Sequence, residues 1–75
     1  METNPPSQDS LIRRTRKQKG MSLADVADKV GVSKQEVSMW ELRQRTPDVY
    51  HLYALGKALD LPLNDIAKDL LRITN

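Results

Sequence analysis

Basic side chains gather near the start of this sequence. Five of the twelve Lys and Arg residues lie within seven positions, and they are Arg13, Arg14, Arg16, Lys17 and Lys19. A one-sided basic patch is the electrostatic signature of a nucleic-acid-binding surface. The same residues also suit an ordinary solvated helix face. Charge by itself therefore leaves both interpretations open.

Groups that could perform catalysis or hold a metal are lacking in the sequence. It contains no cysteine and a single histidine, His51, which has no metal-ligating partner at suitable spacing. There is no Ser/His/Asp or Cys/His arrangement and no glycine-rich phosphate loop. We therefore predict no enzyme, no metal, no cofactor and no small-molecule ligand. His51, Tyr50 and Tyr53 are interpreted as structural, with both tyrosines packed on the helix that carries them.

Length and composition restrict the domain organisation. A chain of 75 residues allows one compact domain, and domains of this size bury a comparatively small fraction of their surface. The polar start with Pro5-Pro6 lacks the apolar region of a signal peptide. No apolar run approaches the roughly 20 residues that span a bilayer. We predict a flexible N-terminal arm at 1–9, a folded domain at 10–75 and no membrane contact.

Two predicted helices meet at Gly31. The first of them begins at Ser22, whose spacing to Asp25 indicates a capping box, and ends at the glycine. The next begins at Ser33, with a full capping box to Glu36 predicted. A connection this short forces a sharp crossing between the helices. That is the geometry of a helix-turn-helix.

Three further helices are predicted around this pair, and no strand. Their expected bounds are 10–19, 49–59 and 63–72. Gly56 costs about 1 kcal/mol relative to alanine inside a helix, so we expect another helix to approach closely there. The side chains expected to face inward on the last two helices are Leu52, Leu55, Leu59, Leu63, Ile66, Ala67 and Leu70.

A set of small and apolar residues connects these elements. Ala27 leaves room for the crossing helix, Gly31 makes the turn, and Val37 with Trp40 anchors the inner face of the third helix. The residues that carry a family resemblance are Arg16, Gly20-Met-Ser22, Val26-Ala27, Gly31-Val-Ser33, Val37-Ser-Met-Trp-Glu41, Pro47 and Leu55-Gly-Lys-Ala-Leu59. From Leu11 to about Leu71 the chain resembles the phage repressor/Cro-type helix-turn-helix family, also called the xenobiotic-response-element type. The resemblance implies an all-α, five-helix repressor-like DNA-binding domain with its helix-turn-helix at helices 2 and 3.

The resemblance also implies a set of base-reading residues, because the second helix of the motif enters the major groove. Gln35 can bind adenine and Lys34 can bind guanine or a phosphate, whereas the capping role of Ser33 already explains that serine. Ordinary helix surface is the alternative for this first turn. The predicted base-reading residues are Ser33, Lys34, Gln35, Ser38 and Met39.

Phosphate contacts are expected around this helix. Helix N-termini attract anions, and Arg16 matches a family position that pairs with Glu41 and is also able to touch phosphate. The predicted phosphate-binding residues are Arg16, Ser22, Leu23, Arg43, Gln44 and Arg45.

The sequence departs from the family pattern at four residues. Leu23 replaces a usual glutamine, Thr15 replaces a common core leucine, and Leu42-Arg43 stands where Asn-Gly is frequent. We predict that the third helix runs one or two residues further, with Arg43 replacing the asparagine at a phosphate. Leu23 and Leu42 are predicted to be exposed apolar residues.

The resulting functional prediction is sequence-specific binding of double-stranded DNA by a transcriptional regulator, a repressor acting as a dimer on a two-fold site. A cytoplasmic protein of bacterial or phage type, associated with the nucleoid, is expected. The alternative is a protein-interaction module with the same fold and little DNA readout, which Leu23 and Leu42 motivate. The predicted homodimer contact comprises Leu63, Ile66, Leu70, Leu71 and Ile73.

Overall fold

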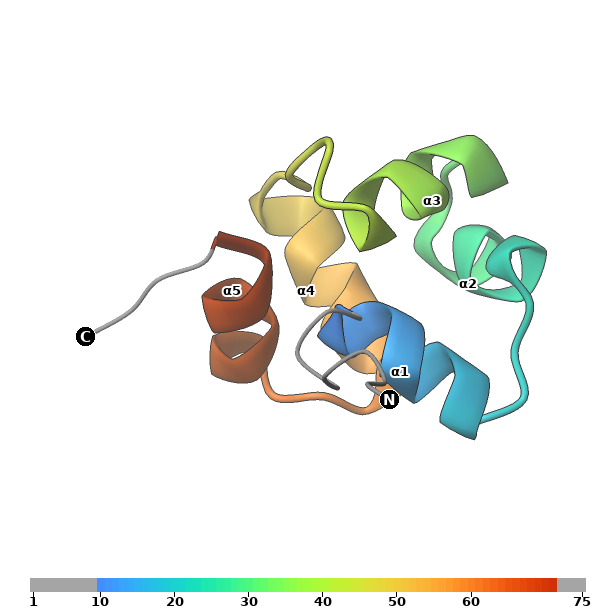
Figure 1. The fold of residues 1–75 in the computed structure, drawn as a ribbon, viewed down its shortest axis with the longest axis horizontal. Helices are drawn as coiled ribbons and strands as arrows, with labels where there is room; N and C mark the ends of the chain where they lie inside the picture. The colour runs from blue at the N-terminus through green and yellow to red at the C-terminus, as the bar shows by residue number, and fades with distance from the viewer. Residues whose placement is uncertain (1–9, 72–75) are drawn as a thin grey trace, which may run out of the picture.

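Five helices make up the part of the chain that the computed structural model describes, residues 10–71 (Figure 1). They are α1 (Leu11–Gln18), α2 (Leu23–Val30), α3 (Lys34–Glu41), α4 (Val49–Leu59) and α5 (Leu63–Leu71). These residues contain no strand, which confirms the all-α prediction. α4 packs against α1, α2 and α5, while α3 packs against α1 and α2.

Side-chain caps set the starts of the first four helices. Ser10, Ser22 and Ser33 each accept the backbone N–H of the third residue that follows, and Asp48 accepts that of His51 at 2.9 Å. The first turn of a helix leaves N–H groups without backbone partners, so each cap stabilises its helix by about 1 kcal/mol. The predicted helix starts are confirmed to within one residue.

The core lies between all five helices, and ten apolar side chains are buried in it: Ile12, Val26, Ala27, Val37, Trp40, Leu52, Leu55, Leu59, Ile66 and Leu70. Leu63 was predicted to face inward and is 45% exposed. Helical spacing places Leu63 on the same face as Leu70, but Leu63 begins α5 and its neighbours cover that first turn only partly. The prediction for Leu63 is therefore wrong.

The predicted homodimer contact is corrected by the same packing. Ile66 is fully buried and Leu70 is 5% exposed within a single chain, so neither side chain is available to a second copy. A small domain has little apolar surface to bury, and here the core uses Ile66 and Leu70, whereas Leu63 of the predicted contact stays exposed. The side chain of Leu71 and residue Ile73 lie outside the described part of the chain.

Both tyrosines of α4 lie on its outer face. Tyr50 is 84% and Tyr53 is 58% exposed, so neither ring is part of the core. Leu52 and Leu55 occupy the opposite face of α4 and take up its contacts with the core. The ammonium group of Lys57 lies 5.6 Å from the centre of the Tyr53 ring, within range of a cation–π interaction.

Gly56 lies against the backbone of the α4–α5 connection. A Cβ atom at position 56 would be 2.9 Å from the carbonyl oxygen of Leu61 and 3.6 Å from the Cδ1 atom of Ile66. The Leu61 N–H donates to the Gly56 carbonyl at 2.9 Å. The close neighbour is thus mainly a loop, and not the helix that the sequence predicted.

We expect Gly56→Ala to destabilise the domain. Overpacking against a backbone atom costs about 1–3 kcal/mol, which outweighs the gain of up to about 1 kcal/mol in helix propensity. Urea unfolding monitored by circular dichroism measures the net change, which we expect to be about 1 kcal/mol. Lys57→Gly is the matched control at the exposed neighbouring position, where glycine should be the destabilising residue. A more stable Gly56→Ala variant would contradict the close approach.

Candidate nucleic-acid interface

The turn between α2 and α3 has the geometry that the sequence predicted. Ser22 Oγ accepts the Asp25 N–H at 3.0 Å and Asp25 Oδ2 accepts the Ser22 N–H at 2.9 Å, completing the first capping box. Gly31 ends α2 with a φ of 87°, a left-handed conformation in which glycine lacks the steric cost of other residues. Its N–H donates to the Ala27 carbonyl at 2.7 Å. The helix-turn-helix geometry is confirmed.

The capping box predicts a dependence on acid. Hydrogen bonds from the Ser22 backbone N–H and then its hydroxyl hold the pKa of Asp25 below its ordinary value of 3.8. A folded-state pKa that is lowered adds stability above the unfolded pKa, and this stability is lost as the pH falls through the folded value. Asp25→Asn should therefore melt at a lower temperature than the native chain at pH 6, and the gap should close as the pH falls through the lowered pKa of Asp25.

Thermal melts by circular dichroism across this range measure the gap. Asp28→Asn is the matched control because it removes a carboxylate from the same helix outside the cap. An Asp25→Asn gap that stays constant down to the lowest pH would contradict the assignment.

The two faces of α3 differ in burial. Val37 is fully buried and Trp40 is 1% exposed, so they anchor the helix in the core. The opposite side carries the residues predicted to read bases, which are Ser33, Lys34, Gln35 and Met39, all exposed, and Ser38, which is half-buried.

The second capping box forms only in part. Ser33 Oγ accepts the Glu36 N–H at 3.1 Å, but the Glu36 carboxylate accepts the indole N–H of Trp40 at 3.1 Å. The same carboxylate oxygen lies 3.2 Å from Nε of Arg45. A buried indole N–H requires an acceptor, and Glu36 is one helical turn away. The prediction of a full box is therefore wrong, and Glu36 instead joins Trp40 to Arg45.

Arg16 and Glu41 tie α1 to the end of α3. Arg16 Nε lies 2.6 Å from Glu41 Oε2, and Nη2 lies 3.1 Å from Oε1. Nη1 donates to the Met21 carbonyl at 3.0 Å. Hydrogen bonding to Glu41 raises the pKa of Arg16, and the residues are only 9% and 4% exposed. This geometry favours a structural clamp, and the phosphate role of Arg16 stays a prediction.

Arg43 lies in the loop after α3, turned toward α5. The helix ends at Glu41, so the prediction of a longer helix is wrong. Arg43 takes a φ of 60°, the left-handed conformation that the family's glycine adopts easily. Its Nη2 atom lies 3.1 Å from Asp69 Oδ1, and its side chain is only 19% exposed. We therefore leave Arg43 out of the proposed phosphate contacts.

Asp69 is a structural residue that sequence reasoning missed. Besides holding Arg43, its Oδ2 atom accepts the backbone N–H of Leu11 at 3.0 Å. One carboxylate thus joins α5 to the start of α1 and to the α3–α4 loop. Its partners are 58 and 26 residues away, so no local pattern could have identified them.

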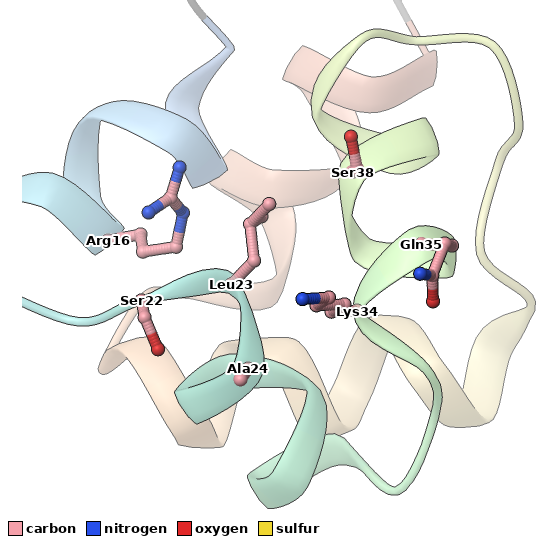
Figure 2. A pocket seen from close by; sticks show the side chains of 7 residues that line it. All are labelled: Arg16, Ser22, Leu23, Ala24, Lys34, Gln35 and Ser38. Carbon is pink, nitrogen blue, oxygen red and sulfur yellow. The ribbon is translucent and has the colours of Figure 1, made fainter.

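An open cleft brings together six of the predicted residues (Figure 2). It has a volume of about 510 Å³ and lies between α1, the start of α2 and the outer face of α3. Its lining residues are Arg16, Ser22, Leu23, Ala24, Lys34, Gln35 and Ser38. Of the other predicted residues, Ser33, Met39, Arg43, Gln44 and Arg45 lie outside the lining, and Gln44 and Arg45 are exposed.

Residues 10–71 offer no candidate for a membrane span or for a metal site. No helix within residues 10–71 is both long and apolar enough to cross a bilayer. Those residues also hold no group of three or more His, Cys, Asp or Glu side chains that could bind a metal ion.

The chain belongs to the repressor/Cro-type helix-turn-helix family. The sequence model of the family described as "Helix-turn-helix" matches residues 12–66, which include all of α2, α3 and α4. The chain is also 32% identical over 57 residues to an uncharacterised HTH-type transcriptional regulator, YqaE, of Bacillus subtilis (strain 168). That match covers 76% of this chain and 49% of the relative, so the chain spans about half the length of YqaE.

Proposed function

We propose that this chain binds double-stranded DNA sequence-specifically and represses transcription as a dimer on a two-fold site. The observation that carries the proposal is the cleft, which places base-reading candidates on α3 beside the start of α2 (Figure 2). Membership of a helix-turn-helix family and the likeness to a protein named as a transcriptional regulator support it.

The outer face of α3 supplies the direct readout in this proposal. Lys34 and Gln35 are exposed and line the cleft together with Ser38. A glutamine side chain can donate to and accept from adenine, and a lysine can donate to guanine. Val37 and Trp40 hold the opposite face in the core, so the helix presents these polar groups without reorganising.

Positioning on the duplex is assigned to phosphate contacts, which carry no sequence information directly. The first amides of α2, at Leu23 and Ala24, lack carbonyl partners within the helix and point toward its N-terminal end. Gln44 and Arg45 follow α3 in an exposed loop. These groups flank the base-reading face and are its proposed phosphate ligands.

The salt dependence of binding tests the proposal. Each neutralised phosphate contributes about −0.9 to the slope of log K against log salt concentration. Fluorescence anisotropy with duplexes selected from a random pool should therefore give a slope of roughly −2 to −4 if Arg45, with or without Lys34, neutralises a phosphate in each copy of a dimer. Half-site spacing in the selected duplexes reports whether two copies bind. Absence of duplex binding at low salt would overturn the proposal.

A protein-interaction module is the second candidate, favoured by one observation. Large apolar or aromatic side chains stand exposed after α3 and along α4, with Leu42 at 56%, Val49 at 80%, Tyr50 at 84% and Tyr53 at 58%. Exposed apolar patches are typical of protein contacts. A folded chain that binds no duplex DNA at low salt would favour this candidate over DNA binding.

A further inference from the structure

Leu23 is a large apolar side chain in a cleft whose other lining residues are mainly polar or charged. Ala24 is the other apolar residue of the lining, beside Arg16, Ser22, Lys34, Gln35 and Ser38. Figure 2 shows Leu23 projecting from the start of α2 into the space between α1 and α3. The residue is half-buried and packs partly on the core. Part of its side chain therefore remains open to whatever enters the cleft.

Arg16 is held by other residues, so Leu23 is a principal side chain that a ligand in the cleft would contact on the α2 side. The guanidinium of Arg16 is taken up by Glu41 and the Met21 carbonyl. The Ser22 hydroxyl accepts the Asp25 N–H and is also hydrogen-bonded to the Asp25 carboxylate. Among side chains, a ligand in the cleft therefore meets polar groups of α3 on one side and the apolar surface of Leu23 on the other, next to the backbone N–H groups at the start of α2.

The chemistry of the major groove offers one group that suits this apolar surface. Adenine, guanine and cytosine present hydrogen-bonding edges there, and thymine alone adds a methyl group, on C5. Lys34 and Gln35 suit the hydrogen-bonding edges, whereas Leu23 has no group with which to read them.

We propose that Leu23 is a specificity-determining residue that packs on the C5-methyl group of a thymine in each half-site. This inference rests on the proposed function and names one base that the chain would recognise. Burial of one methyl group between Leu23 and its neighbours in the cleft makes thymine about fourfold better bound than the same base without the methyl.

The test replaces thymine by deoxyuridine, which removes the methyl group and leaves base pairing intact. Starting from a selected duplex, each thymine is replaced in turn, and the affinities of the native chain, Leu23→Ala and Leu23→Met are measured by anisotropy. We expect one position per half-site at which the replacement weakens the native chain about fourfold. Leu23→Ala should lose this sensitivity, and Leu23→Met should retain most of it because its side chain is also long and apolar.

Two controls separate readout from folding. Circular dichroism melts establish that each variant is folded at the assay temperature, since Leu23 also contacts the core. Val49→Ala is the control variant, because Val49 is also apolar, is 80% exposed and lies outside the cleft lining. It should leave the sensitivity that depends on Leu23 unchanged.

The possible results are distinguishable. One result is duplex binding with no thymine whose replacement weakens the native chain more than it weakens Leu23→Ala. That result would overturn this inference and leave the proposed function standing. A contact between Leu23 and deoxyribose would give that result, because the sugar is unchanged by the substitution. Failure to bind any duplex would overturn the proposed function and the inference together.

Discussion

Replacing Glu41 by alanine is expected to destabilise the domain by about 3–5 kcal/mol, the usual effect of removing one partner from a buried ion pair. Glu41 is 4% exposed and accepts two hydrogen bonds from Arg16. Without it the guanidinium keeps its bond to the Met21 carbonyl but loses the neutralising charge. Small domains have a total stability of only about 5 kcal/mol, so the variant should be substantially unfolded well below the melting temperature of the native chain.

Urea unfolding followed by circular dichroism measures the loss. The double variant Arg16→Met with Glu41→Leu removes both charges and should recover most of the stability, because well-packed apolar residues often replace a buried pair without penalty. Asp60→Asn is the matched control at an exposed pair, where Asp60 Oδ2 lies 3.1 Å from Lys19 Nζ and the Asp60 side chain is 82% exposed. It should change stability little. An equally small effect of Glu41→Ala would show that Arg16 finds another partner.

Replacing Gln35 by alanine is expected to relax sequence preference at one base pair. The loss there should be about 1–3 kcal/mol, roughly five- to 150-fold in affinity, with other positions of the site nearly unaffected. Gln35 is exposed on the outer face of α3 and lines the cleft, so its truncation removes hydrogen-bonding groups without disturbing the core. Competition binding with every single-base variant of a selected duplex measures the effect.

Arg45→Ala is the contrasting variant. Arg45 Nε lies 3.2 Å from the Glu36 carboxylate, and its side chain is 59% exposed. As a phosphate ligand it should contribute equally to all sequences, so its loss should weaken them alike and reduce the salt slope by about one for each bound copy. An unchanged base preference in Gln35→Ala would contradict the readout assignment, although the fold would stand.

Local patterns determined the helices and the turn. Local features such as the caps at Ser22 and Ser33, the left-handed glycine at position 31 and the apolar spacing of α4 involve residues only a few positions apart. Their energetics depend little on the rest of the chain, and sequence reasoning placed them correctly. The Arg16–Glu41 contact is long-range, and it was predicted because its positions match a family pattern.

Tertiary packing decided the features that local patterns left open. Asp69 joins three elements that lie far apart in sequence, and Glu36 serves the Trp40 indole instead of its own helix start. Helical spacing predicted the correct inner face of α5. Only the packing of the neighbouring helices determines how much of that face is covered, and it leaves Leu63 exposed and Ile66 buried. A hydrogen-bonding group or an apolar helix face could pair with several residues of the same sequence. The packing of the five helices determines which of these residues it contacts.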